Sequence, residues 1–350
     1  MKLITFIQAI ILYFGTLPTT LSSQSKTTKY VMEINTYIDF ANENINGLLL
    51  LQRLFDYQNR EVLESLGQEI GKISIIDNKS LPSNLFEDSE AKFFEVSPNA
   101  LYNQIKAHSS ELPENYLIIL DFIVDEMHYI TNELNDLRFL TEELISDDLD
   151  ELESKRAIFD QFQKVENLLM SYLEIHVSLA NIIDTMTAEL KLESDLVEFH
   201  RFNTFADEIY FNNRDLIFSF YNKDLENLNA FILQNQKALL EIENLELYLP
   251  KHKDLHKIKD RTESISRNMT YLNEKTTIFE SYDFDGNTEF LVYERYYAYY
   301  NHVLLPGFNK YGNGIASELN KVIDNYNIPV IKYLELPHYF KTIIPTIKVD

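Results

Sequence analysis

The chain lacks cysteine altogether and is poor in glycine and in positive charge. Without cysteine it forms no disulfide and carries no thiol nucleophile, so a hydrophobic core has to stabilise the fold. A chain of 350 residues is long enough to bury a substantial core. Secreted eukaryotic proteins of this size usually contain disulfides, so for an exported protein the absence of cysteine favours a bacterial periplasm or cell exterior.

The scarcity of glycine restricts the fold classes that are possible, and the scarcity of positive charge restricts the classes of partner. The chain has 8 glycines, whereas the usual frequency of ~7% would give about 24. Because glycine weakens helix interiors, this scarcity predicts a mostly helical protein. Lys and Arg number 31 against 55 Asp and Glu, a net charge of -24. Such a surface repels phosphate backbones, which argues against a nucleic-acid partner and leaves basic proteins and metal cations. Alternatively, the acids cover only the solvated faces of helices.

The one long apolar run lies at the N-terminus. A lysine precedes the run Leu3 to Phe14, and small polar residues follow it up to Ser23. This order is typical of a secretory signal peptide, and the run is shorter than the roughly 20 residues that span a bilayer. We therefore expect residues 1–22 to be a cleaved signal peptide, with no transmembrane segment in the mature chain and a periplasmic or secreted location. The alternative is an uncleaved signal anchor.

Apolar residues recur every three or four positions along several stretches, as on one face of a helix. The repeats average about 3.5 residues, so the helices should pack at shallow angles, as in bundles and coiled coils. The sequence predicts an all-α fold: an elongated multi-helix bundle, or two bundles in series, with an extended C-terminal tail. The repeating positions are Val31, Ile34, Ile38, Ala41, Ile45 and Leu48; Leu120, Ile123, Met127, Ile130, Leu134 and Leu137; Val165, Leu168, Tyr172, Ile175, Leu179, Ile182 and Met186; and Leu255, Ile258, Ile265, Met269 and Leu272.

Caps and helix breakers indicate where the helices begin and end. Ser97 followed by Pro98 is typical of a helix start, and Pro113 should open the next helix. Residues 66–96 contain glycines, a proline and a short β-like run, which predicts an irregular insert. Three prolines from Pro329 onward exclude a long helix there.

A weak boundary near 190–204 divides the helical part of the chain in two. The predicted domains are a signal peptide over 1–22, an N-terminal helical bundle over 23–190 that contains the insert 66–96, a C-terminal helical bundle over 191–327 and an extended tail over 328–350.

No stretch of the sequence forms a convincing catalytic motif. The chain has no Gly-x-Ser-x-Gly turn and no glycine-rich phosphate loop. Its eight histidines are scattered, without the paired Glu-x-x-His of di-iron bundles. His252 and His256 have the spacing of two metal ligands on one helical face, but lysines surround them, which favours an exposed basic helix start. These features lean toward a protein that is not an enzyme.

Residues 283–294 resemble the twelve-residue calcium loop of EF-hand proteins. Calcium takes six to eight oxygen ligands, which that loop supplies from fixed positions. The ligands that the resemblance implies here are Asp283, Asp285, Asn287, the carbonyl of Glu289, and Glu294. Thr288 stands where the EF-hand loop has a glycine, and a β-branched residue resists the positive φ of that turn. The alternative interpretation is a turn and a helix cap without a metal.

An aromatic stripe follows this loop. Tyrosine pairs an apolar ring with a hydroxyl, which suits a glycan or peptide surface, although a stripe at helical spacing also fits a core or a seam between helices. The stripe consists of Tyr293, Tyr296, Tyr297 and Tyr300. Pro306, Gly307, Gly312 and Gly314 come next and predict a tight corner between two helices.

Together these features predict a non-enzymatic binding or scaffold protein of the cell envelope, secreted or periplasmic. Its long helical faces or its C-terminal tail would engage another macromolecule, either an envelope protein or a glycan. No cofactor is expected apart from calcium at 283–294. Two alternatives stay open: a calcium-binding helical protein that uses this loop, and a hydrolase with a dispersed carboxylate site.

Overall fold

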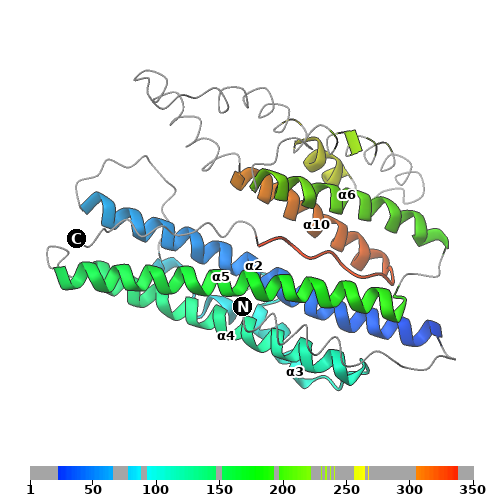
Figure 1. Cartoon of the computed structure of the whole chain (residues 1–350), viewed down its shortest axis with the longest axis horizontal. Helices are drawn as coiled ribbons and strands as arrows, with labels where there is room; N and C mark the ends of the chain where they lie inside the picture. Colours follow the sequence, from blue (N-terminus) through cyan, green and yellow to red (C-terminus); the bar gives the residue numbers. More distant parts are fainter. Residues whose placement is uncertain are drawn as a thin grey trace. The chain divides into compact units, whose positions relative to one another are not determined.

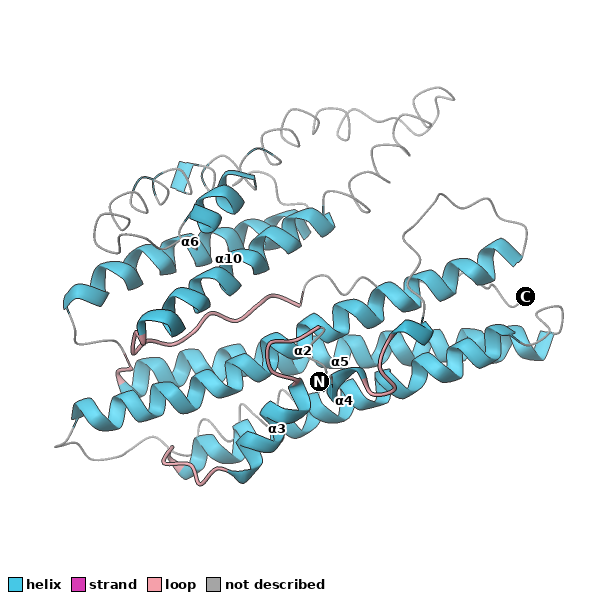
Figure 2. Cartoon of the chain, turned by 180° about the vertical axis from the view of Figure 1, so that it is seen from behind, coloured by secondary structure: helices cyan, strands magenta, loops and turns pink. Residues whose placement is uncertain are grey.

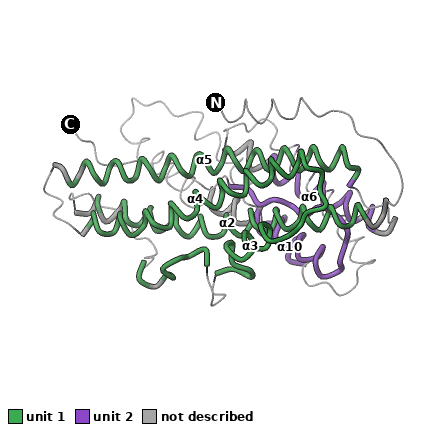
Figure 3. The backbone as a smooth tube through the Cα atoms, turned by 90° about the horizontal axis from the view of Figure 1, so that it is seen from below, with its two compact units in different colours: residues 1–191, 340–350 green, residues 192–339 purple. Residues whose placement is uncertain are grey.

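A computed structural model describes residues 23–65, 78–87, 93–146, 152–192, 197–221 and 305–337, with 256–264 and single helical positions between 230 and 267. Within these ranges the protein is all-α, as predicted: helices are joined by loops and turns, and there is no β-strand (Figures 1 and 2). The chain divides after Lys191 into two compact units, which we call the first and second units (Figure 3). The predicted signal peptide 1–22 lies outside the described residues.

Three long helices build the first unit: α2 (Ser23–Ser65), α4 (Glu114–Ser146) and α5 (Leu152–Leu190). Each packs against the other two. The predicted apolar positions of α2 and α4 are all buried, which confirms these two seams. In α5 one position is wrong: Leu168 is only half-buried, and its neighbour Leu169 takes the buried place. The buried face therefore steps by four and then three from Val165 through Leu169 to Tyr172, in place of three and then four. No described helix has both the length and the apolar character to cross a membrane.

The starts of two helices follow local chemistry. Helix α3 (Pro98–Ala107) begins after Ser97, whose side-chain oxygen accepts the N–H of Ala100 at 3.3 Å, so the predicted cap is confirmed. Helix α4 begins directly after Pro113, and the Pro113 carbonyl accepts the N–H groups of Tyr116 and Leu117 in its first turn. A proline at such a position loses no hydrogen bond, because the first amides of a helix have no partner inside it.

The described part of the predicted insert consists of loops and two short 3₁₀ turns, η1 (Asn78–Ser80) and η2 (Leu85–Glu87). Turn η2 packs on α2, α3 and α4 and buries Leu85 and Phe86. A Cβ atom at Gly47 of α2 would lie 2.5 Å from a ring carbon of Phe86 and 3.1 Å from Phe94. Gly47 therefore lets the insert approach the helix backbone closely. We call residues 78–87 the insert segment.

Helices α6 (Val197–Tyr221) and α10 (Leu305–Tyr326) pack together in the second unit. The predicted corner at 306–314 is wrong, because α10 begins at Leu305 and continues through Gly307, Gly312 and Gly314. Pro306 sits in the first turn, where it does not interrupt the helix. Gly314 makes room for another residue: a Cβ atom there would lie 2.1 Å from the guanidinium of Arg261.

A left-handed residue ends α10 and reverses the chain. Asn327 has φ 51, its N–H donates to the carbonyl of Asp324, and the N–H of Ile328 donates to that of Ile323. This pattern is a Schellman motif, with asparagine in the place that glycine usually takes. The residues that follow, 328–337, are extended and run back along α10 (Figure 1). We call them the tail segment.

Candidate functional site

Most of the site residues predicted from sequence lie outside the described residues. This holds for the tyrosine stripe, for the calcium-loop candidates and for His252, so these sites stay predictions. His256 is described and exposed. Within the part of the chain that the structure describes, no three His, Cys, Asp or Glu side chains gather as metal ligands would.

The polar feature with the most specific geometry is a pair of asparagines on α10. The Asn320 amide accepts the N–H of Tyr333 at 2.7 Å and donates to the carbonyl of the same residue at 2.8 Å. Asn313 does the same with Leu336, at 2.8 Å and 3.2 Å. Each side chain thus binds both main-chain groups of one tail residue, as a neighbouring β-strand would.

The spacing of the two asparagines matches the extended segment that they hold. Asn313 and Asn320 are seven residues apart in the helix, a rise of about 10.5 Å. Tyr333 and Leu336 are three residues apart in an extended chain, about 10 Å. The earlier asparagine binds the later tail residue, so the segment runs antiparallel to α10. All four hydrogen bonds are buried, where an unpaired amide would cost about 1–3 kcal/mol.

Helix α6 also binds the tail segment. The Tyr210 hydroxyl donates to the carbonyl of Leu334 at 2.6 Å, and the Tyr333 hydroxyl donates to Asp207 at 2.8 Å. The two tyrosine rings lie 4.7 Å apart between centroids. Burial, and next the charge of Asp207, raise the pKa of Tyr333 well above its usual value, so its hydroxyl keeps its proton and donates.

Charged side chains of α10 pair with the tail segment and with residues 257 and 261. Lys332 of the tail segment forms an ion pair with Asp324 of α10 at 2.7 Å, and its side chain is only 8% exposed. Glu318 of α10 is 3% exposed and pairs with Arg261 at 3.1 Å and with Lys257 at 3.4 Å. The Arg261 guanidinium reaches Glu318 over Gly314, one helical turn earlier. We call the faces of α6 and α10 that contact the tail segment the α6–α10 surface.

A comparable clamp holds the insert segment in the first unit. Asn135 of α4 accepts the N–H of Leu85 at 3.1 Å and donates to the carbonyl of Ser83 at 3.2 Å. The fully buried Arg138 donates to the carbonyls of Pro82 and Ser83. Its Nε and Nη1 atoms have no hydrogen-bond partner among the described residues. Burial lowers the pKa of Arg138 to about 10, because a desolvated charge is poorly compensated there.

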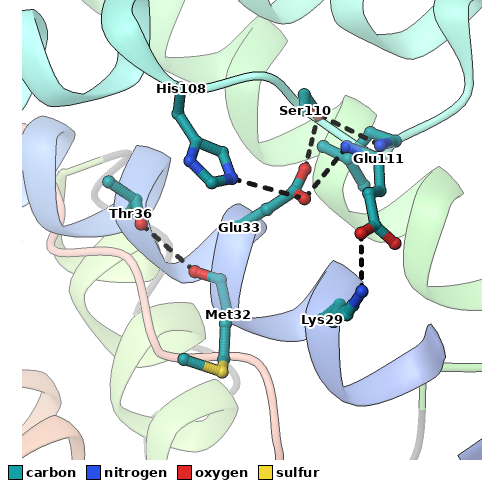
Figure 4. Close-up of polar contacts among 8 residues, drawn as sticks. Lys29, Met32, Glu33, Thr36, His108, Ser110 and Glu111 are labelled. Atoms are coloured by element: carbon teal, nitrogen blue, oxygen red, sulfur yellow. Dashed lines mark hydrogen bonds and ion pairs between the residues drawn. The ribbon is translucent and has the colours of Figure 1, made fainter. Parts of the chain in front are cut away.

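A third group of polar contacts fixes the loop between α3 and α4 to α2 (Figure 4). The Glu33 carboxylate accepts the Ser110 hydroxyl and, at 3.0 Å, the N–H of Glu111. His108 Nε2 lies 3.9 Å from the same carboxylate, and Lys29 binds Glu111 at 2.6 Å. These contacts fix the loop to α2 through one mostly buried carboxylate and therefore serve the packing of the first unit.

A scan for protein families found no matching family model, and searches of the curated proteins and of the solved structures found no match.

Sequence reasoning missed the residues of the α6–α10 surface. One signal was present: Asn313, Ala316, Asn320 and Ile323 follow the three-and-four stepping of a buried helix face. An asparagine at such a position is buried, and a buried amide needs partners. The identity of those partners, residues 333 and 336, depends on the reversal at Asn327, which no periodicity indicates.

Proposed function

We propose that the protein is a non-enzymatic binding or scaffold protein, periplasmic or secreted, that holds extended polypeptide on α6 and α10. The observation that carries this proposal is the pair of asparagines, Asn313 and Asn320, each bonded to both main-chain groups of one residue. Such contacts recognise an extended polypeptide as such, because every residue except proline offers the same N–H and C=O groups.

The same geometry favours binding over chemistry as the role of this surface. Amide and hydroxyl groups that are fully used in hydrogen bonds to a main chain position a polypeptide but do not activate it. They also favour a protein segment over a glycan as the partner, because the paired donor and acceptor of one amide match the peptide unit. The first unit has a buried three-helix core of its own.

The location outside the cytoplasm rests on the apolar run and small residues at the N-terminus. Intact-mass measurement of the protein from its native host tests it. A mature chain that begins within a few residues of Ser23 supports export with cleavage, whereas a mass that includes Met1 to Leu21 contradicts it.

The binding role is tested by affinity purification from the native host with three forms of the full chain. Wild type and Asn325→Ala, an exposed asparagine on the same helix, should retain the same polypeptide partner. Asn313→Ala combined with Asn320→Ala should lose that partner while circular dichroism shows that the helices remain. A partner that binds all three forms equally contradicts the proposed use of the α6–α10 surface.

A further inference from the structure

One ion pair and one hydrogen bond to a carboxylate join side chains of the tail segment to the surface that holds it. Asp207 accepts the hydroxyl of Tyr333, and Asp324 forms an ion pair with the buried side chain of Lys332. Within the tail segment, 328–337, the charged residues are Lys332 and Glu335. The resident ligand thus offers a lysine at a defined position and no net positive charge. Opposite charge brings such pairs together and selects among extended segments.

The contacts also define what a second ligand needs. It has to offer an N–H and a C=O at the two positions now taken by Tyr333 and Leu336, which excludes proline there. At the position of Tyr333, an aromatic hydroxyl on the ligand would reach Asp207. At the position of Lys332, a lysine would reach Asp324. The side chains of Leu334 and Leu336 are both only 8% exposed, so a second ligand also needs apolar side chains at these two positions.

We propose that the α6–α10 surface binds, in trans, an extended segment of another polypeptide that carries a Lys-Tyr pair, and that the tail segment is its built-in competitor. This inference rests on the proposed function and adds the class of ligand and a mode of regulation. The tail segment follows α10 through a single turn at Asn327. A ligand tethered so closely has an effective concentration in the millimolar range, so a weak partner is excluded until its own affinity or a second contact outweighs the tether.

The direct test uses a fluorescein-labelled synthetic peptide of residues 328–339 and the full chain, with binding followed by fluorescence anisotropy. The tail-weakened variant, Tyr333→Ala with Leu336→Ala, removes the resident competitor and leaves Asn313 and Asn320 in place. It should bind the peptide at least ten times more tightly than wild type does. The milder Tyr333→Phe, which removes only the hydroxyl bond to Asp207, should fall between the two. Adding Asn313→Ala and Asn320→Ala to the tail-weakened variant should abolish binding.

Peptides with a methyl group on one main-chain nitrogen test whether the main chain is read. N-methylation at the position of Tyr333 or of Leu336 removes the hydrogen that an asparagine accepts, so binding should drop by at least tenfold. N-methylation at Ile331, whose amide takes part in none of these contacts, should change it by less than threefold. Raising the salt concentration should weaken the binding of all the peptides, because the Lys332 to Asp324 contact is partly exposed.

These experiments test three claims separately: competition by the tail segment, the class of ligand, and recognition of the main chain. If wild type and the tail-weakened variant bind the peptide with equal affinity, the tail segment does not compete for the α6–α10 surface. The proposed function still stands in that case if binding of the native partner depends on Asn313 and Asn320. Failure of the tail-weakened variant and of Tyr333→Phe to bind, with helix content retained, overturns the surface as a receptor for this ligand class. Equal binding of a scrambled peptide of the same charge overturns main-chain recognition in favour of simple charge attraction.

Discussion

In the first unit Asn135 of α4 binds the main chain of the insert segment, and in the second unit Asn313 and Asn320 of α10 bind that of the tail segment. The same amide chemistry serves two different attachments. The insert segment lies between α2 and α3 in sequence and buries Leu85 and Phe86 against three helices. The tail segment follows the last described helix through one turn.

This difference separates a structural clamp from a displaceable one. Removing the insert segment from α4 would expose its apolar residues and leave Arg138 and Asn135 buried without acceptors, so the first unit would unfold with it. The tail segment also buries apolar side chains, such as those of Ile328 and Val330. Helices α6 and α10 pack against each other directly, however, so we expect them to stay packed when the tail segment is removed. We therefore expect the first clamp to open only by global unfolding and the second to open locally.

The largest effect should follow Arg138→Ala in the first unit. It removes a fully buried side chain and its bonds to the carbonyls of Pro82 and Ser83. Loss of these bonds and the cavity together should lower the free energy of unfolding by about 4 kcal/mol. Arg156→Ala, at an exposed position of α5, is the control and should cost less than about 0.5 kcal/mol. Equal costs in denaturant unfolding would show that the insert segment is not clamped.

A pH dependence should distinguish the first unit from the second. Burial raises the pKa of Glu43 on α2 from 4.5 to about 7; the charges of Glu95 and Asp39 add to the rise, and hydrogen bonds to Asn46 and to the Glu95 main chain oppose it. A carboxyl with a raised pKa binds more protons when folded, so its contribution to stability is full below pH 4.5 and is lost as pH rises through 7. The loss should approach about 3 kcal/mol.

Glu43→Gln isolates this effect in chemical unfolding at several pH values. The variant should be more stable than wild type at pH 8 and should lose the fall in stability between pH 4.5 and 7. Glu174→Gln, at an exposed position of α5, should keep the wild-type profile. Parallel profiles for wild type and Glu43→Gln would contradict a buried carboxyl at this site.

The same asparagine substitution in each unit sharpens the comparison. Asn135→Ala leaves the N–H of Leu85 buried without its acceptor, which should cost about 2 kcal/mol. Asn320→Ala should cost only about 1 kcal/mol, because we expect the tail segment to open locally, which lets the main chain of Tyr333 bond to water. Denaturant unfolding measures both, with Asn325→Ala as the exposed control. A greater cost for Asn320→Ala than for Asn135→Ala would reverse the assignment of the two clamps.

The smallest expected effects on stability are those of alanine substitutions at Gly47 and Gly314, the two glycines that lie against another side chain. Gly47→Ala places a methyl group against the rings of Phe86 and Phe94, and such overpacking costs about 1–3 kcal/mol. Gly314→Ala meets only the flexible end of Arg261, and alanine gains about 1 kcal/mol of helix propensity, so the net change should be near zero. Melting temperatures compare the two. A loss at Gly314 as large as that at Gly47 would mean that Arg261 is held as rigidly as the insert.

The sequence predicted the helices well because helix formation is largely local. Apolar stepping located the buried faces of α2 and α4, and Ser97 with Pro98 located the start of α3. The error at 306–314 came from treating glycine as a breaker, when Gly314 serves the approach of Arg261 from a part of the chain more than forty residues earlier. Whether a glycine serves a turn or a close contact depends on tertiary packing, which local patterns do not contain.

The α6–α10 surface was beyond the reach of the sequence for a related reason. Its contacts join residues that are 13, 23, 124 and 126 positions apart, and side-chain to main-chain bonds leave almost no mark in the sequence of the segment that is held. The sequence did contain the asparagines at helix-face positions of α10 and the prolines that keep the tail extended. Only the turn at Asn327 brings the two together.

Native-state hydrogen exchange of the full chain, resolved to single amides, tests the central claim most directly. The amides of Tyr333 and Leu336 should be protected, because Asn320 and Asn313 accept their hydrogens. They should nevertheless exchange through an opening of lower free energy than that of Val322 within α10 or of Leu85 in the insert segment. Identical opening free energies for Tyr333, Leu336 and Val322 would show that the tail segment is a fixed part of the second unit, and would contradict the account of a surface that holds a displaceable polypeptide.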